Sequence, residues 1–199
     1  MIRDNIVSKN SNFIGCWKIE DEKLFHGLID FFEKNEHLHK RGVVGSGYNS
    51  EKKKTTDITI DPNSLKNKSF SIFNIYFEQL FKCYKDYRKQ WPFLKHNIKN
   101  LDIPSFNLQK YNPGDHFSQL HTERNPGGQM HRVFAWMTYL NDIKSDNGNT
   151  YFPHFDLKIK PEKGKTLIWP AEWTHAHAGE ILKDETKYII TGWMCFSFN

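Results

Sequence analysis

The residues of this sequence most able to do chemistry are a histidine and a glutamate two positions apart, His121 and Glu123. On a β-strand, residues i and i+2 point to the same face, so this imidazole and carboxylate would project together. His175 and His177 form a second such pair downstream, and either one could supply a third ligand. Two imidazoles and one carboxylate bind a metal through one face and leave positions open, as non-haem Fe(II) sites require. On the triplet alone, a solvated pair on an exposed strand is the simpler interpretation.

The residues around these pairs form six ordered motifs within residues 111–193. They are YNPGDHFSQLHTE, RVFAWMTYLND, NGNTYFP, PEKGKTLIWP, THAHAG and KYIITGW. In this order and at this spacing they resemble the catalytic core of the 2-oxoglutarate- and Fe(II)-dependent dioxygenases, specifically the prolyl 4-hydroxylase-like branch. The first hundred residues are similar to that family only loosely, as helices that support the sheet.

The resemblance implies a role for each matching residue. His121, Glu123 and His177 match the iron ligands, and His175 is the alternative to His177 as the distal ligand. Lys187 matches the basic residue that pairs with the distal carboxylate of 2-oxoglutarate. An independent reason supports it, because a dicarboxylate bound to iron at one end needs a cation at the other.

Four further residues are expected around the same co-substrate. Thr191 lies four positions after Lys187, so it faces the same way along a strand and could donate to the same carboxylate. The resemblance places Tyr139 near that carboxylate and makes Tyr111 a weaker candidate. For both tyrosines, core packing with a satisfied hydroxyl is an equally good interpretation. Trp193 is expected to line the pocket.

Two positions depart from the family pattern. The family has Asp where this chain has Glu123, which keeps a carboxylate oxygen but reaches one methylene further. Iron binding should therefore survive, although the open positions on the metal could be re-aimed. The second departure is Asn147, which stands where the first Gly of a Gly-Gly pair is expected and which a turn tolerates.

By resemblance, the chain is expected to be an enzyme that uses Fe(II), 2-oxoglutarate as co-substrate, O2, and ascorbate as reductant. It would hydroxylate a C–H bond of a prolyl residue in a peptide or protein and release succinate and CO2. The residues leave open the same chemistry on another side chain, a small molecule or a nucleic acid. A cupin-like metal-binding module or isomerase, or a non-catalytic binding domain, is also open, but the metal module would leave Lys187 and Thr191 without a role.

The surrounding pattern predicts the elements that must position these residues. Leu24, Leu28, Phe31 and Phe32 recur at helical spacing within 21–39, and a second amphipathic helix is expected over 69–87. Short runs rich in β-branched and aromatic residues then alternate with turns. The strands are expected at 13–19, 106–111, 116–123, 133–141, 150–152, 157–159, 166–169, 175–181 and 187–198.

This order predicts a mainly β fold with N-terminal helices: a double-stranded β-helix, or cupin-like jelly roll, braced by helices on one face. We expect one domain over 1–199, with a helical support region at 1–103 and the catalytic core at 104–199. Residues 41–68 are expected to form a mobile loop in which only 55–60 is strand-like. The run Lys52, Lys53 and Lys54 is expected to be solvated, or to lie in a loop that closes over a peptide.

Composition narrows the setting. The 28 basic residues, 23 of them Lys, exceed the 23 acidic ones by five. They are dispersed along the chain, which argues against base-specific nucleic-acid binding. Three distant cysteines, no signal peptide and no membrane span predict a reducing, cytosolic setting. The richness in Lys, Asn, Ile and Phe is typical of an AT-rich microbial or viral genome. The oligomeric state is not predicted.

Overall fold

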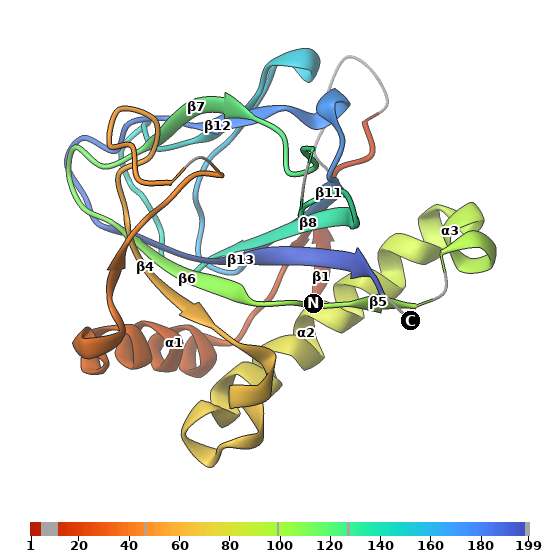
Figure 1. Cartoon of the computed structure of the whole chain (residues 1–199), viewed down its shortest axis with the longest axis horizontal. Coiled ribbons are helices and arrows are strands. Elements are labelled where there is room, and N and C mark those ends of the chain that lie inside the picture. The colour runs from red at the N-terminus through yellow and green to blue at the C-terminus, as the bar shows by residue number, and fades with distance from the viewer. Residues whose placement is uncertain (5–11, 46, 99, 127, 198–199) are drawn as a thin grey trace.

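A computed structural model describes residues 1–4, 12–45, 47–98, 100–126 and 128–197 of the chain (Figure 1). Over these residues the fold contains two antiparallel sheets. The larger sheet has the order β1 (Ile2–Asp4), β2 (Gly15–Lys18), β11 (Lys165–Pro170), β8 (Arg132–Tyr139), β13 (Lys187–Phe196), β6 (Phe106–Tyr111), β4 (Thr56–Ile60) and β3 (Lys40–Arg41), and β5 (Leu101–Asp102) pairs with β13. The smaller sheet has the order β10 (Leu157–Ile159), β9 (Thr150–Phe152), β12 (His177–Gly179) and β7 (Phe117–His121).

Three α-helices accompany the sheets: α1 (Glu22–Lys34), α2 (Ser71–Gln90) and α3 (Pro92–Asn97). Asp21 caps α1, because its side chain accepts a hydrogen bond from the Leu24 backbone N–H at 3.0 Å. The helix ends at Lys34 rather than at residue 39, since Asn35 leaves helical geometry and a short 3-10 turn follows. The second predicted helix is confirmed as α2 and extends three residues further than expected.

Two hydrophobic cores divide the molecule into layers. One joins the buried faces of α1 and α2 to one face of the larger sheet, through residues such as Phe32, Phe73 and Trp136. The other lies between the two sheets and includes Phe152 and Trp169. Figure 1 shows the same arrangement, with α1 and α2 below the larger sheet and β7 and β12 above it. The helices therefore cover one face of this sheet, and the opposite face is turned toward the smaller sheet.

The mainly β, antiparallel character is confirmed, and most predicted strands are present. Strands β6, β9 and β10 have the predicted bounds, and β2, β8, β11 and β13 differ from them at their ends. The predicted strand 116–123 is wrong at its end, because β7 stops at His121. The predicted strand 175–181 is also wrong, because His175 ends a 3-10 helix and β12 begins at His177. The short elements β1, β3, β5 and α3 were not predicted, and residues 198–199 of the last expected strand lie outside the described residues.

The strand-like part of the expected loop, 55–60, forms β4, which pairs with β6 along its whole length. The residues before it are also anchored. Lys54 and His116 exchange backbone hydrogen bonds of 2.8 and 3.1 Å, and the Gln119 N–H donates to the Lys52 carbonyl at 3.3 Å. This segment therefore runs beside β7 and links the smaller sheet to the larger one. The mobility expected for 41–68 and the single-domain organisation stay predictions.

Within the described residues, no helix combines the length and the apolar character needed to cross a membrane. The three cysteines, Cys16, Cys83 and Cys195, are buried and free.

Candidate active site

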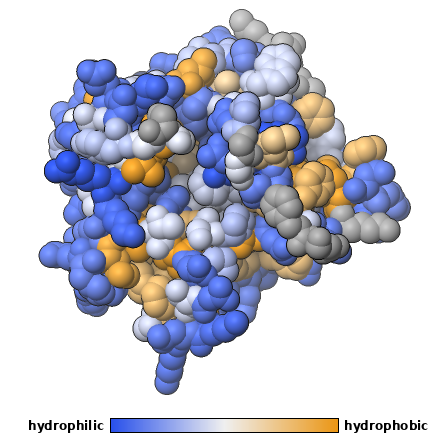
Figure 2. Space-filling view, in the orientation of Figure 1, coloured by the Kyte–Doolittle hydropathy of each residue, from blue (hydrophilic) through white to orange (hydrophobic). Residues whose placement is uncertain are grey.

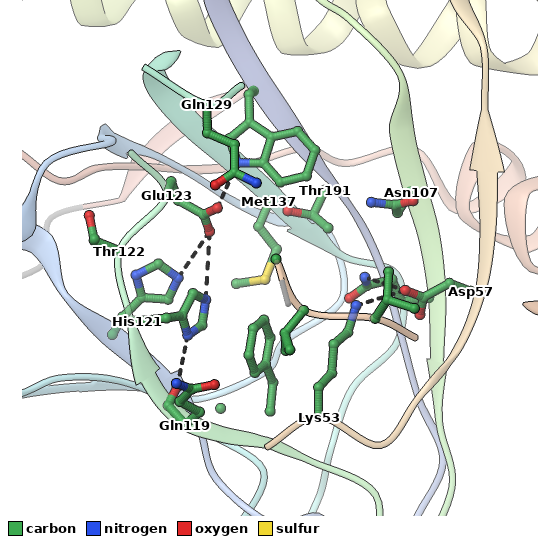
Figure 3. Close-up of a pocket in the computed structure, with 18 of the residues that line it drawn as sticks. Lys53, Asp57, Asn107, Gln119, His121, Thr122, Glu123, Gln129, Met137 and Thr191 are labelled. Carbon is green, nitrogen blue, oxygen red and sulfur yellow. Dashed lines mark hydrogen bonds and ion pairs between the residues drawn. The ribbon is translucent and has the colours of Figure 1, made fainter. Parts of the chain in front are cut away.

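A cavity of about 970 Å³ opens between the two sheets. Its walls include every residue that the sequence analysis assigned to iron or to 2-oxoglutarate except the alternative His175: Tyr111, His121, Glu123, Tyr139, His177, Lys187 and Thr191. Figure 3 shows His121 and Glu123 on one side of this cavity and Lys53 on the other, with Met137 and Thr191 between the two sides. The structure thus gathers residues that are up to 80 positions apart in the sequence.

Three potential metal-ligand groups converge at one end of the cavity. His121 ends β7, Glu123 lies in the bend that follows, and His177 begins β12, where it is directly opposite His121. One ligand atom from each of the three lies within 4.8 Å of the others. Glu123 Oε1 is 3.7 Å from His121 Nε2 and 3.4 Å from His177 Nε2. We call this cluster the metal end of the cavity.

Each of the two imidazoles is oriented by the carbonyl of the residue two positions earlier in the chain. His121 Nδ1 lies 2.8 Å from the Gln119 carbonyl, and His177 Nδ1 lies 2.9 Å from the His175 carbonyl. A carbonyl can only accept, so both Nδ1 atoms carry the proton and both Nε2 lone pairs face the cavity. Burial, followed by the nearby His121, lowers the pKa of His177, which keeps it in the neutral form that binds metals.

The bend after β7 explains how Glu123 reaches the cluster from outside a strand. The Thr122 hydroxyl and the Arg124 N–H both donate to the Ala171 carbonyl, at 2.9 and 2.8 Å. Arg132 donates to the Glu123 carbonyl at 3.0 Å. These contacts hold the bend against β11 and the start of β8, so the Glu123 side chain turns inward.

The carboxylate of Glu123 is also held from its second oxygen. Trp193 Nε1 donates to Oε2 at 2.7 Å, and an Arg132 nitrogen lies 3.5 Å from the same atom. The Arg132 guanidinium lies 3.5 Å from the centre of the Trp193 ring, so the two side chains brace each other. Burial raises the pKa of Glu123, but hydrogen bonds and charge from the two imidazoles, when they carry a proton on Nε2, outweigh that effect and hold the pKa well below its usual range. Oε1 therefore remains an ionised ligand atom facing the histidines.

Lys187 lies at another part of the same cavity, which we call the lysine end. It pairs with Tyr111 in the β13–β6 register, and its ammonium lies 4.5 Å from the centre of the Tyr111 ring. Its Nζ donates to the Gly148 carbonyl at 2.7 Å. The residue is 3% exposed, and it forms no ion pair with any residue in the described part of the chain. Burial lowers the pKa of Lys187 to about 8.

Gly148 is required where it stands. Its φ of +69° favours glycine, and a Cβ there would lie 2.8 Å from a Leu182 methyl and 3.6 Å from Lys187 Nζ. The Gly148 carbonyl orients the lysine. Gly148 stands at the second position of the expected Gly-Gly pair, so this position of the NGN motif provides the contact with Lys187. Asn147, in place of glycine at the first position, leaves that contact intact. Its side chain accepts a hydrogen bond from the Lys183 N–H.

The three hydroxyls expected near 2-oxoglutarate line the cavity but already have protein partners. Thr191 Oγ1 donates to the Trp136 carbonyl at 2.8 Å, and Tyr111 donates to Gln109 Oε1 at 3.0 Å. The Tyr139 hydroxyl lies 2.6 Å from Thr150 Oγ1. All three hydroxyls are therefore positioned by the protein itself, and their contact with a co-substrate stays a prediction.

His175 is directed away from the metal end. It is 3% exposed, and its ring lies 5.1 Å from that of Phe155, outside the residues that line the cavity. Burial is the main reason that its pKa is lowered to about 4, so the ring is neutral. Because His175 belongs to a 3-10 helix, the predicted same-face relation to His177 is absent.

The expectation that Lys53 is solvated is wrong. Lys53 is 4% exposed, and its Nζ lies 2.7 Å from Asp57 Oδ2, while Thr55 and Gln109 donate to the same carboxylate at 2.7 and 3.0 Å (Figure 3). Gln109 also accepts from Tyr111 and so links this group to the lysine end. Sequence reasoning missed Asp57, Gln109 and Arg132, because the contacts that give them a place in the cavity lie between strands.

Comparison with known proteins agrees with this geometry. Residues 106–195 match the family model of the 2OG-Fe(II) oxygenase superfamily. No curated protein is matched. The resemblance to the 2OG-Fe(II) oxygenases that the sequence motifs indicated is confirmed over residues 106–195.

Several solved structures share the fold. A viral collagen prolyl hydroxylase from Paramecium bursaria Chlorella virus-1, in its 2OG complex, is 15% identical with a TM-score of 0.67, covering 94% of this chain and 98% of that one. A Pseudomonas putida prolyl-4-hydroxylase is 14% identical with a TM-score of 0.71, covering 94% and 95%. A Trichoplax adhaerens prolyl hydroxylase, in complex with a hypoxia inducible factor oxygen degradation domain peptide fragment, is 14% identical with a TM-score of 0.68, covering 94% and 84%.

Proposed function

We propose that this chain is an Fe(II)- and 2-oxoglutarate-dependent dioxygenase that hydroxylates a prolyl residue in a peptide or protein and releases succinate and CO2. The observation that carries the proposal is the pairing of two features in one cavity. One is the convergence of His121, Glu123 and His177, and the other is the buried ammonium of Lys187. We interpret the two facing sheets as the double-stranded β-helix of this family.

The metal end fits a divalent iron ion. Adjacent ligand atoms bound at about 2.1 Å to one ion lie about 3 Å apart. The observed separations of 3.4 and 3.7 Å are slightly longer, and the Nε2 atoms and Oε1 face one another. Glu123 would bind through Oε1, since Trp193 and Arg132 occupy Oε2.

The lysine end suits the distal carboxylate of 2-oxoglutarate. A buried cation without a carboxylate partner is costly, and a ligand carboxylate would supply the missing charge through a charge-assisted hydrogen bond. Tyr111 and Gly148 hold the Lys187 ammonium from two sides and leave it directed at the cavity. A metal-binding module that needs no co-substrate gives no reason to bury this lysine beside the cluster.

The protein supplies position, charge and a sheltered pocket, and bound iron would supply the oxidation of 2-oxoglutarate by O2 that makes C–H hydroxylation possible. Trp193 and Arg132 hold the carboxylate ligand in one direction, and the two carbonyl contacts fix the imidazoles. Met137, Ile189 and Trp169 form apolar walls suited to a prolyl ring. A cavity of about 970 Å³ is large enough to hold a peptide segment in addition to a small dicarboxylate.

Succinate formation tests this proposal. Purified protein with Fe(II), ascorbate and 2-oxoglutarate should form succinate faster when proline-containing peptides are added, and mass spectrometry should detect a peptide heavier by one oxygen. His177→Ala should abolish this activity, whereas His175→Ala, the matched control, should retain it if the variant folds. Absence of turnover with every peptide, together with absence of Fe(II)-dependent 2-oxoglutarate binding, would contradict the proposal.

The same assay distinguishes a peptidyl-proline substrate from other substrates of the same reaction. Succinate formation without peptide oxidation, but with oxidation of a free amino acid or an oligonucleotide, would keep the reaction type and change the substrate. Ascorbate enters the proposal as the reductant, and its requirement is tested by leaving it out.

A further inference from the structure

The mouth of the cavity carries an excess of positive charge. Lys40, Arg41 and Lys52 line it, and among the described residues none of the three has a carboxylate within ion-pair distance. Lys40 and Arg41 are exposed, and Arg41 lies over the ring of Tyr48. Figure 2 shows a hollow between the two sheets, with hydrophilic side chains beside it over the region of β3 and β4.

No lining carboxylate in the described part of the chain balances these charges. The cavity walls there contain two carboxylates, Asp57 and Glu123. Asp57 is neutralised by Lys53 at 2.7 Å, and Glu123 faces two imidazoles and Arg132. The three cations of the mouth therefore add to a cavity that is already neutral or positive in its interior.

Backbone contacts fix where two of these side chains, Lys40 and Lys52, leave the chain. Lys40 is opposite Asp57 in the β3–β4 register, so its side chain lies on the face of the sheet that bears Asp57. The Lys52 carbonyl accepts from the Gln119 N–H, which fixes Lys52 beside the strand that ends in His121. An incoming substrate thus meets positive charge on two sides of the opening.

We propose that the mouth selects peptides that carry acidic residues next to the target residue. This inference rests on the proposed function and names its substrate class. Fixed charges of one sign around an opening attract the opposite charge and speed its association. Val43 and Leu120, exposed by 59% and 53%, line the same mouth and offer apolar contact to a peptide.

These features favour a peptide over a nucleic acid strand. Single-stranded nucleic acids bind along a longer track of cations with aromatic side chains on which successive bases stack. This mouth has three cations, and two of its exposed apolar side chains, Val43 and Leu120, are aliphatic. Trp173 is an exposed aromatic on the wall, so an oligonucleotide is included in the test.

The test compares pairs of proline-containing peptides that are identical except for Glu or Gln on either side of the proline. At low salt, near 0.05 M, kcat/KM for succinate formation should be about three- to tenfold higher with the Glu peptide. At 0.5 M salt the ratio should fall below about twofold, because screening removes the attraction between exposed charges.

Variants locate the effect. The double variant Lys40→Glu/Lys52→Glu should abolish or reverse the preference, whereas Lys82→Glu/Lys89→Glu, an equal charge change on α2 away from the cavity, should keep it. If the double variant unfolds by circular dichroism, Lys40→Gln/Lys52→Gln replaces it and should reduce the ratio toward one.

The outcomes are distinguishable. Equal kcat/KM for both peptides at low salt would overturn this inference and leave the proposed function intact. No peptide-dependent turnover with either peptide would contradict the proposed function itself. A fluorescent single-stranded oligonucleotide that binds more tightly than the Glu peptide, and loses binding in the double variant, would overturn the inference in favour of a nucleic acid.

Discussion

The two ends of the cavity are built in different ways. At the metal end, each imidazole is oriented by the carbonyl of the residue two positions earlier in its own chain segment. At the lysine end, Lys187 is oriented by Gly148, 39 positions away, and by Tyr111 on the neighbouring strand. Local contacts therefore orient the two imidazoles, whereas long-range contacts position both the Glu123 carboxylate and the Lys187 ammonium. A substitution at the lysine end should therefore change 2-oxoglutarate affinity without changing metal affinity.

The largest effect is expected from removing a ligand at the metal end. His177→Ala should weaken Fe(II) binding by at least about 100-fold. Removing a residue that only hydrogen-bonds to a metal ligand already lowers metal affinity by about 10–100-fold, and His177 is a ligand itself in the proposed site. Calorimetric titration with Mn(II) in place of Fe(II) measures the metal affinity without turnover. His175→Ala should bind metal as tightly as the parent protein. Weaker binding by His175→Ala than by His177→Ala would show that His175, and not His177, is the distal ligand.

A smaller effect is expected at the lysine end. Lys187→Met should raise the KM for 2-oxoglutarate by about 10–100-fold, because hydrogen bonds to charged groups contribute about 1.5–3 kcal/mol. Metal affinity should remain within about twofold of the parent, since the lysine contacts none of the metal-end residues. A Lys187→Met variant with normal KM would show that another group holds the co-substrate.

A contact behind the metal end should have a weaker influence than a ligand. Trp193→Phe keeps the ring under Arg132 but removes the donor to Glu123 Oε2. Metal affinity should fall by about tenfold, which is the lower range for an outer contact of a ligand. Trp173→Phe, at an exposed ring on the cavity wall, is the matched control and should leave metal affinity unchanged.

The smallest effect is a pH dependence confined to the lysine end. Burial lowers the pKa of Lys187 to about 8, so in the free protein its ammonium loses its proton as pH rises through that value. In the proposed site 2-oxoglutarate would bind the charged form, so its affinity should be constant below about pH 7 and fall several-fold between about pH 7.5 and 9. Lys187→Arg should remove this dependence over the same range, because arginine stays charged. An unchanged pH profile in Lys187→Arg would assign the titration to another group.

The features that could be predicted from the sequence are those that depend on local patterns. The strands β6, β9 and β10 were predicted at their observed bounds because alternating patterns between turns are local. The gathering of His121 and His177 in one cavity was expected because each lies in a recognisable motif. Glu123 was expected on a strand, but it projects from a bend that contacts Ala171, just after β11, and Arg132 on β8, and such contacts leave no local pattern.

The residues around Lys53 show the limit most clearly. Three consecutive lysines in a polar segment are typical of a solvated run, yet Lys53 is buried against Asp57. The reason is the pairing of β4 with β6 and the backbone exchange between Lys54 and His116, which turn alternate side chains of the run inward and outward. Neither partner strand is adjacent in sequence, so burial there follows from the tertiary fold.

One measurement tests most directly whether the two ends form a single oxygenase site. Calorimetric titration of 2-oxoglutarate under anaerobic conditions should show tight binding when Fe(II) is present and much weaker binding when it is absent. His177→Ala and Lys187→Met should each lose the tight binding, the first with loss of metal and the second with metal retained. Binding of equal strength with and without Fe(II), or unchanged in Lys187→Met, would contradict a site that spans both ends of the cavity.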